Sequence, residues 1–348
     1  MRAKAPKSTL SHRFWPVVII ALLASIMVFF ASLSGGRPDW QVLAHLLGFA
    51  PAGAGDTTNE LVLLLRGPRT VAALAIGAML AASGLILQAV VRNPLAEPGL
   101  LGINAGAALS TVSISLGALP FAAGLPLTLA ACIGGMLVAI IVYLVSWKSG
   151  TNTGRLILAG VGVGALCSGL ISLITLFAEP QAVQRALAWL SGSLGGVTVA
   201  QAQLLMVFAL MGCAALFLSH RQLDVLNLDR TSIVGLGLPF ETTRLALLAV
   251  AVILASVATA IGGIIAFVGL IAPHAARLLV GHQHRAAAPV AVLVGAALCA
   301  FADLAARTVI APAQLPAGIV TSLLGAPYFL FLMIRSTSGS AAQRSAHV

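Results

Sequence analysis

The chain has 348 residues, of which 59% are hydrophobic and only 8% charged. Soluble globular proteins carry about 25% charged residues, so this composition excludes a soluble domain, and its apolar content excludes a disordered chain. The net charge of +10 lies mostly in short breaks between apolar runs, which is the pattern of membrane topology and argues against nucleic acid as a partner.

The first apolar runs predict four membrane crossings. About 20 helical residues cross the hydrocarbon core once, and residues 14–36 form such a charge-free run. A cleavable signal peptide is the rival interpretation of this run, but no A-x-A site follows it. Residues 70–91 cross a second time. Residues 98–147 are expected to cross twice, because Pro120 and Pro126 divide this long run near its middle.

The middle of the chain predicts two further crossings and a polar segment. Residues 156–178 and 201–219 are each long enough to span, and the short polar run 181–190 between them favours a helix at the membrane interface. Residues 220–244 follow as the longest polar stretch inside the bundle. This stretch is predicted to lie in the cytoplasm.

The last part of the chain contains one charge-free run whose length does not fit a whole number of membrane crossings. Residues 245–276 are too many for one crossing and too few for two. Gly262, Gly263 and Pro273 interrupt the run, which predicts a full helix followed by a broken or re-entrant element. Residues 286–302 and 315–334 complete a count of ten spans.

Ten spans define an all-α membrane protein with one polytopic domain, residues 14–335, between cytoplasmic tails 1–13 and 336–348. With the N-terminus inside, fourteen of the 19 Lys and Arg residues fall on the cytoplasmic side and five outside. This asymmetry agrees with the positive-inside rule and predicts that both termini are cytoplasmic.

A shared spacing suggests an internal repeat of opposite orientation. Gly84 precedes Pro94 by ten residues, and Gly263 precedes Pro273 by the same number. If these points are equivalent, five spans separate them, so the two halves cross the membrane in opposite directions. Inverted repeats of this kind are typical of transporters, although one spacing can also arise by chance.

Two arginines flank a proline at the outer end of the second span, in Arg66-Gly67-Pro68-Arg69. Guanidinium groups held at the water interface suit the carboxylates of a docking protein. The alternative is that both simply anchor the helix end by reaching into the interface.

Two other segments each allow a structural and a functional interpretation. Asn93, Pro94, Glu97 and Pro98 lie in a loop where Glu97 is either a helix cap or an ion or proton site. Residues 223–238 mix apolar and charged positions, which suits either a helix in the groove of a partner or one flat on the lipid.

The histidines and cysteines favour packing over metal binding. His274 is expected to be a buried hydrogen-bonding residue, and the segment 282–285 a cytoplasmic loop; no carboxylate or cysteine is near enough in sequence to complete a metal site. Asp303 and Arg307 are one helical turn apart and are expected to pair. Neither a P-loop nor a hydrolase motif occurs, so the chain is not expected to be an enzyme or to bind a cofactor.

The combined motifs resemble a known family. They are Arg66-Gly67-Pro68-Arg69, Arg92-Asn93-Pro94-Leu95-Ala96 with Pro98, the run from Gly263 to His274 and Arg277, Asp303 with Arg307, Leu315-Pro316-Ala317-Gly318, and Gly325-Ala326-Pro327. Together they are similar to the FecCD-like permeases of bacterial ABC importers for iron-siderophores, haem and vitamin B12. The resemblance implies a ten-helix subunit of a homodimer or heterodimer in the inner membrane, driven by two separate ATPase subunits.

The resemblance also implies roles for individual residues. Arg66, Arg69 and Arg307 match arginines that hold glutamates of a periplasmic binding protein. Positions that match the ATPase-coupling helices are Leu223, Asp224, Leu226, Leu228, Asp229, Arg230, Gly235 and Gly237. Positions that match the cytoplasmic gate are Thr151, Asn152, Thr153 and Gly154, the last of which is a hydroxyl residue in some relatives. Asn93, Pro94, Glu97, Pro98, Pro273 and His274 match structural loop motifs.

The cargo and the class of transport leave alternatives open. An iron chelate, in particular a ferric siderophore, is favoured over haem or vitamin B12. An ion-coupled secondary transporter that uses Glu97 or Asp303 as its proton carrier is the hypothesis of a different class. An intramembrane enzyme that uses His274 is a third, for which the sequence offers no nucleophile.

Overall fold

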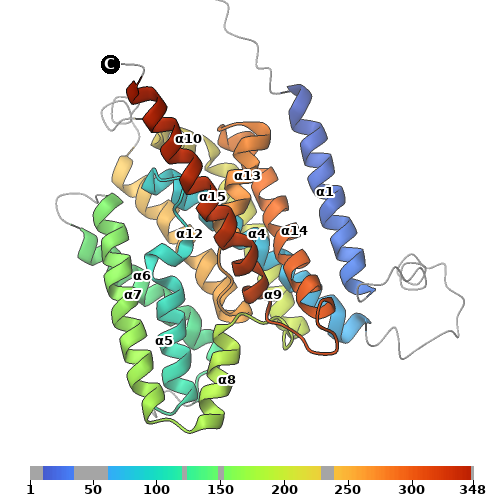
Figure 1. The fold of residues 1–348 in the computed structure, drawn as a ribbon, viewed down its shortest axis with the longest axis vertical. Helices are drawn as coiled ribbons and strands as arrows, with labels where there is room; N and C mark the ends of the chain where they lie inside the picture. The colour runs from blue at the N-terminus through green and yellow to red at the C-terminus, as the bar shows by residue number, and fades with distance from the viewer. Residues whose placement is uncertain (1–10, 35–61, 120–123, 148–152, 229–238, 346–348) are drawn as a thin grey trace, which may run out of the picture.

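The computed structural model describes residues 11–34, 62–119, 124–147, 153–228 and 239–345, and in this part of the chain the regular structure is entirely helical. Seven of the described helices are long and apolar enough to cross a membrane. Figure 1 shows a bundle in which α1 (Ser11–Leu33) lies at one edge and α7 (Thr153–Leu176) at the opposite edge. The first residue of α1 and the last of α15 (Ala317–Ser345) lie at the same end of the bundle.

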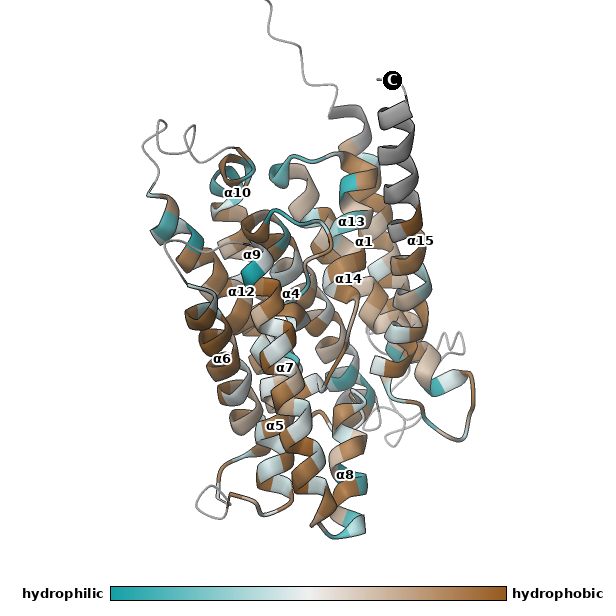
Figure 2. Cartoon of the chain, turned by 60° about the vertical axis from the view of Figure 1, so that its left-hand side comes forward, coloured by the Kyte–Doolittle hydropathy of each residue, from teal (hydrophilic) through white to brown (hydrophobic). Residues whose placement is uncertain are grey.

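The predicted helices appear in the predicted order. After α1 come η1 (Val62–Arg66), α4 (Gly67–Val91), η2 (Pro98–Leu101), α5 (Ile103–Ser115) and α6 (Leu127–Ser146). After α7 come α8 (Pro180–Leu190), α9 (Val199–Leu218), α10 (His220–Leu226), α12 (Phe240–Gly262), α13 (Val268–Val280), α14 (His284–Thr308) and α15. Figure 2 shows hydrophilic residues mainly toward the two ends of the bundle and hydrophobic residues along its length, as expected for membrane helices.

Two of the predicted spans are shorter helices than the sequence predicts. Both α5 and α13 have 13 residues, or about 20 Å, whereas the hydrocarbon core is about 30 Å thick. The count of ten complete spans therefore goes beyond the seven helices that length and composition establish in the described part of the chain.

The break in the long run after α9 is where two glycines predict it. α12 ends at Gly262, and Gly263 has a φ of 71°, a left-handed conformation that a residue without a Cβ adopts readily. Pro273, expected to interrupt the same run, instead lies inside α13. The proline has no N–H to donate to the carbonyl four residues earlier, so the Gly269 oxygen accepts from the Gln88 side chain at 3.3 Å.

The predicted equivalence of Gly84 with Gly263 is wrong. Gly84 lies inside α4 with Pro94 in the turn beyond it, whereas Gly263 lies beyond the end of α12 with Pro273 inside the next helix. A repeated order of elements occurs at other positions, because α4 and α12 are each followed by an irregular break and a 13-residue helix. The residues that precede these short helices, Gly102 and Phe267, are both left-handed.

The helix α4 is the centre of the bundle. It packs against α9, α12, α13 and most extensively against α14. Gly77 and Gly295 bring the backbones of α4 and α14 together, since a Cβ at Gly77 would lie 2.1 Å from the Gly295 carbonyl oxygen. Ser83 donates to the Ala251 carbonyl of α12 at 2.7 Å, while Ile76 lies beside Gly262, so α4 and α12 are antiparallel.

Candidate functional site

The arginines of the second span and the Asp303–Arg307 pair lie at one end of the bundle, here called the arginine end. Arg66 ends η1, Pro68 occupies the first turn of α4, where its missing N–H costs no hydrogen bond, and Arg69 follows it. Asp303 and Arg307 lie in the last turns of α14. Because α4 and α14 pack antiparallel, the first turn of one meets the last turns of the other.

Asp303 is the centre of this cluster. Its side chain is completely buried, forms ion pairs with the Arg69 Nη2 at 2.9 Å and the Arg307 Nε at 3.2 Å, and accepts hydrogen bonds from the Arg69 Nε at 3.0 and 3.2 Å. The i,i+4 pair of Asp303 and Arg307 confirms the sequence prediction, whereas the pairing with Arg69 joins residues 234 positions apart. Burying a carboxylate is costly without compensation, and two guanidinium groups provide it here.

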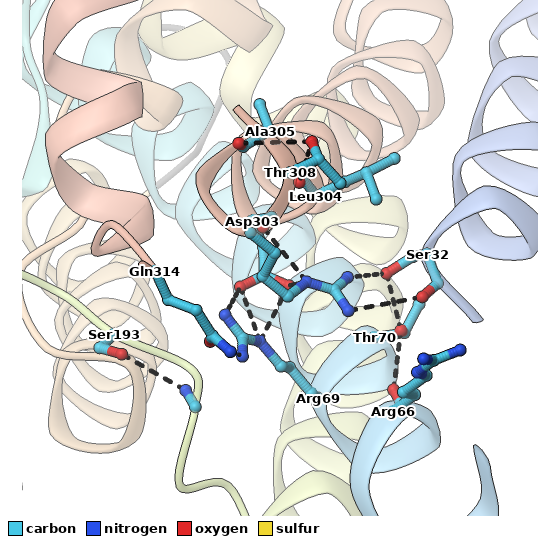
Figure 3. Close-up of polar contacts among 12 residues, drawn as sticks. Ser32, Arg66, Arg69, Thr70, Ser193, Asp303, Leu304, Ala305, Thr308 and Gln314 are labelled. Atoms are coloured by element: carbon cyan, nitrogen blue, oxygen red, sulfur yellow. Dashed lines mark hydrogen bonds and ion pairs between the residues drawn. The ribbon is translucent and has the colours of Figure 1, made fainter. Parts of the chain in front are cut away.

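Polar groups from α1 and the loop before α15 complete the cluster (Figure 3). Arg69 donates to the Gln314 side chain at 2.9 Å, and Arg66 donates to the Leu33 carbonyl at 3.0 Å. Arg307 donates to the Ser32 hydroxyl, which also bonds Thr70 at 2.9 Å. Three arginines and one aspartate give this cluster of described residues an excess of two positive charges.

The arginine end contains a pocket of about 340 Å³. Its lining residues are Leu65, Arg66, Arg69, Gly195, Leu304, Arg307, Thr308 and Gln314. A fixed group of guanidinium donors around such a pocket suits carboxylate or other oxyanion groups, because Arg binds them with two parallel hydrogen bonds. The side chains of Arg69 and Arg307 are each only 11% exposed, so they are held in place before any partner arrives.

The loop 93–98 after α4 is connected to the start of α13 through Glu97. Asn93 accepts from the Leu95 N–H at 2.9 Å, which forms a tight turn after α4. The Glu97 side chain makes no capping hydrogen bond to the helix that follows it, so the helix-cap interpretation is wrong. Its carboxylate instead accepts from the Phe267 N–H, at 3.3 Å, just before α13. Burial raises the pKa of the Glu97 carboxyl above its usual range, and the hydrogen bond from Phe267 opposes this shift.

His274 differs from the expectation of a buried hydrogen-bonding residue. It is half-buried in α13, and its ring packs edge-on against Tyr328 of α15, with ring centroids 5.9 Å apart. The imidazole ring of His274 has no hydrogen-bond partner among the described residues. The polar link of this region is instead Gln88, which accepts from Arg277 and donates to Gly269. No group of three His, Cys, Asp or Glu residues in the described ranges could hold a metal ion.

The predicted ATPase-coupling residues begin with α10, at the other end of the bundle, here called the α10 end. Leu223 and Leu226 are buried, whereas Leu228 is exposed. Asp224 accepts from the His284 backbone N–H at 2.9 Å and from the His284 ring at 2.7 Å. The remaining coupling positions, Asp229, Arg230, Gly235 and Gly237, lie outside the described residues.

The segment 282–285 is not the simple loop that the sequence predicts. His284 is the first residue of α14 and is only 3% exposed. Its ring Nδ1 faces a carboxylate, which in its ionised form can only accept, so the ring nitrogen donates. Sequence reasoning missed this contact because Asp224 and His284 are separated by the whole of α12 and α13.

The predicted gate lies at the start of α7. Thr151 and Asn152 fall outside the described residues, Thr153 is the first residue of α7, and Gly154 is exposed. Sequence reasoning gave no role to the rest of α7. Small and hydroxyl residues that are exposed or half-buried form one stripe along it: Gly164, Ser168, Ser172 and Thr175. Their spacing of four, four and three residues was the signal that could have identified this face.

Comparison with known proteins places the chain in a family. The FecCD transport family matches residues 15–335. The achromobactin transport system permease CbrC of Dickeya dadantii is 42% identical over 329 residues, covering 91% of each chain. The hemin transport system permease HmuU of Yersinia pestis is 40% identical over 288 residues, covering 80% of this chain and 85% of the relative.

A solved structure gives the same result. An inward-facing metal-chelate type ABC transporter has a TM-score of 0.79 and 28% identity, covering 92% of this chain and all of that one. The iron(3+)-hydroxamate import permease FhuG of Bacillus subtilis is 38% identical, covering 92% of this chain and 98% of the relative. The chain therefore belongs to the FecCD transport family and is the permease subunit of an ABC importer.

Proposed function

We propose that this chain, paired with a second permease subunit, forms the pathway by which an iron chelate crosses the bacterial inner membrane. The observation that carries the proposal is the family match over residues 15–335, together with the helix α7, which is largely exposed in the single chain. Ten spans with both termini in the cytoplasm complete the topology. The asymmetry of Lys and Arg along the chain supports that orientation.

The arginine end faces the periplasm and receives a substrate-binding protein. Arg66, Arg69 and Arg307 bind carboxylates of that protein, and the excess positive charge steers its approach. Asp303 fixes two of the three guanidinium groups in advance, which lowers the entropy lost on docking.

The α10 end faces the cytoplasm and contacts the ATPase. Residues from Leu223 to Gly237 form the coupling surface, and the gate residues from Thr151 to Gly154 narrow the exit. The small and hydroxyl residues of α7 line the pathway or the contact with the second permease. In support, Gly162, Gly164 and Gly169 have no atom of the described chain within 4 Å of a Cβ position. Two copies of the chain, or this chain and a relative, form the dimer.

The cargo is an iron chelate, and a ferric siderophore fits the relatives best. Achromobactin and iron(3+)-hydroxamate are named in two relatives that are 42% and 38% identical over 91% and 92% of this chain. Hemin and vitamin B12 permeases match at 40% and 35% identity, so these cargoes are the alternatives within the family.

The docking role is tested most cleanly at Arg66. Its contact among the described residues is with a backbone carbonyl, so Arg66→Glu reverses a charge without separating the buried ion pairs. We expect this variant to weaken binding of the substrate-binding protein at least about tenfold, which is about 1.4 kcal/mol. Uptake should fall accordingly while the protein still inserts into the membrane.

Arg185→Glu is the matched control. Arg185 is exposed on α8, so its reversal changes the net charge equally but leaves the arginine cluster intact. We expect normal docking for this variant. Unchanged docking of Arg66→Glu, or an equal loss in both variants, would contradict the proposed docking surface.

A further inference from the structure

The helices α4 and α14 connect the two ends of the bundle. At the arginine end, Arg69 of α4 pairs with Asp303 of α14 at 2.9 Å. At the α10 end, Arg92, which directly follows α4, donates to the Leu226 carbonyl of α10 at 2.8 Å, and His284 of α14 bonds Asp224. The same two helices therefore hold the proposed docking surface and the proposed coupling segment.

The two helices are packed too closely to move independently. A Cβ at Gly77 would lie 2.1 Å from the Gly295 oxygen, and one at Gly295 would lie 2.5 Å from the Gly77 oxygen. Ala81 and Cys299 fill the adjoining positions. Close-packed interiors transmit displacement instead of absorbing it, so α4 and α14 behave as one body between the ion pair at one end and α10 at the other.

The attachment of α10 to this body depends on few polar groups. Leu223 and Leu226 supply apolar contact, but they do not fix the direction of the helix. Asp224 accepts both the backbone N–H and the ring N–H of His284, which is itself buried. A carboxylate at the first N–H of α14 is also favoured by the positive end of the helix dipole.

We infer that His284 is a positioning residue that, through Asp224, fixes α10 to the α4–α14 body, so that docking at the arginine end changes the position of the ATPase-contacting helix. This inference rests on the proposed function, because it takes the arginine end as the docking surface and α10 as part of the coupling surface. His284 itself contacts neither partner. A purely structural role, in which the contact only stabilises the start of α14, is the alternative that the experiment separates.

The test uses the complete importer in proteoliposomes, with the substrate-binding protein added. His284→Ala removes the ring but keeps the backbone N–H that bonds Asp224. We expect stimulation of ATPase activity by the loaded binding protein to fall about tenfold, within the usual range of coupling between sites. Docking affinity should stay within about twofold, because the arginine cluster is untouched. His284→Asn, which retains a side-chain donor, should recover part of the stimulation.

Two further measurements make the outcome decisive. His282→Ala, an exposed histidine two residues away, should behave as the unaltered protein. Hydrogen exchange of the α10 amides should be faster in His284→Ala than in His282→Ala, whether or not the binding protein is present. Full stimulation in His284→Ala with normal docking would overturn the inference, as would a loss of thermal stability without a loss of stimulation. If docking does not involve the arginine end, Arg66→Glu will dock normally, which contradicts the proposed function. The hydrogen-exchange comparison then still tests whether His284 fixes α10 to α14.

Discussion

The helices α4 and α7 have the same mean hydropathy, yet they occupy opposite environments. In the most apolar part of α4, 89% of the residues are buried inside the bundle, against 11% in α7. In α4, Gly77 and Gly84 contact the backbones of neighbouring helices, whereas Gly162, Gly164 and Gly169 of α7 face no neighbouring segment among the described residues. Mean hydropathy therefore does not distinguish these two kinds of membrane helix. One is buried by its own subunit, and the other has a surface left for lipid, cargo or a second subunit.

The first prediction concerns the tightly packed helix α4, where we expect the greatest loss of stability. Gly84 faces α13, where a Cβ would lie 1.9 Å from the Gly269 carbonyl oxygen. Gly84→Leu should cost about 3 kcal/mol or more, because backbone cannot move aside as a flexible side chain can. Thermal unfolding of the purified protein measures the loss.

Gly164→Leu in α7 is the control for that substitution. No atom of the described chain lies within 4 Å of its Cβ position, so the stability of the single chain should change little. Equal destabilisation by the two substitutions would contradict the difference between the helices.

The second prediction concerns the ion pairs that join α4 to α14. Asp303→Ala removes the carboxylate between two guanidinium groups that are each 11% exposed. Breaking a buried pair commonly costs about 3–5 kcal/mol, and the residual exposure places the expected loss near the low end, at about 3 kcal/mol. Asp303→Asn retains hydrogen-bond acceptors and should lose less. If Asp303→Ala unfolds at the same temperature as the unaltered protein, the buried ion pairs do not stabilise the contact between α4 and α14.

The third prediction concerns Gln88, the polar link between α4 and α13. Gln88→Leu should cost about 2 kcal/mol, because it leaves the Gly269 oxygen and the Arg277 guanidinium without this partner in the interior. Pro273→Ala combined with Gln88→Leu provides the control. The new N–H can bond the Gly269 oxygen within α13, so the double variant should be more stable than Gln88→Leu alone.

The smallest effect on stability is expected in α7. Ser168 is exposed, and its hydroxyl bonds the Gly164 carbonyl of its own helix at 3.0 Å. Ser168→Leu should change the free energy of unfolding of the single chain by no more than about 0.5 kcal/mol. Uptake by the assembled importer should nevertheless fall, since the side chain faces the proposed pathway or partner. Normal uptake would assign this face to lipid.

Part of the fold was predictable because it depends on local sequence. Charge-free runs located the helices, and the pair Gly262-Gly263 located the break after α12, where a left-handed residue is needed. The spacing of Asp303 and Arg307 predicted an ion pair within one helix, and it is present. These features arise from helix geometry and backbone conformation, which neighbouring residues determine.

The remainder depends on contacts between distant segments. Nothing near Arg69 indicates that it pairs with Asp303, and nothing near His284 indicates Asp224. One of the two interpretations of Glu97 was a cap on the helix after it, but the turn after α4 brings its carboxylate to the residue before α13. The shared ten-residue spacing misled because the residues from Gly84 to Pro94 run from helix α4 into a turn, whereas those from Gly263 to Pro273 run from irregular backbone into α13.

The central claim is that this chain is a conduit driven by a separate ATPase, and transport by reconstituted protein tests it most directly. The chain with its permease partner is placed in proteoliposomes, with and without the ATPase subunits, and uptake of a radiolabelled ferric siderophore is measured with loaded binding protein outside. We expect uptake only when the ATPase and ATP are present. Accumulation without the ATPase, driven by an imposed proton gradient and abolished by Glu97→Gln, would contradict it.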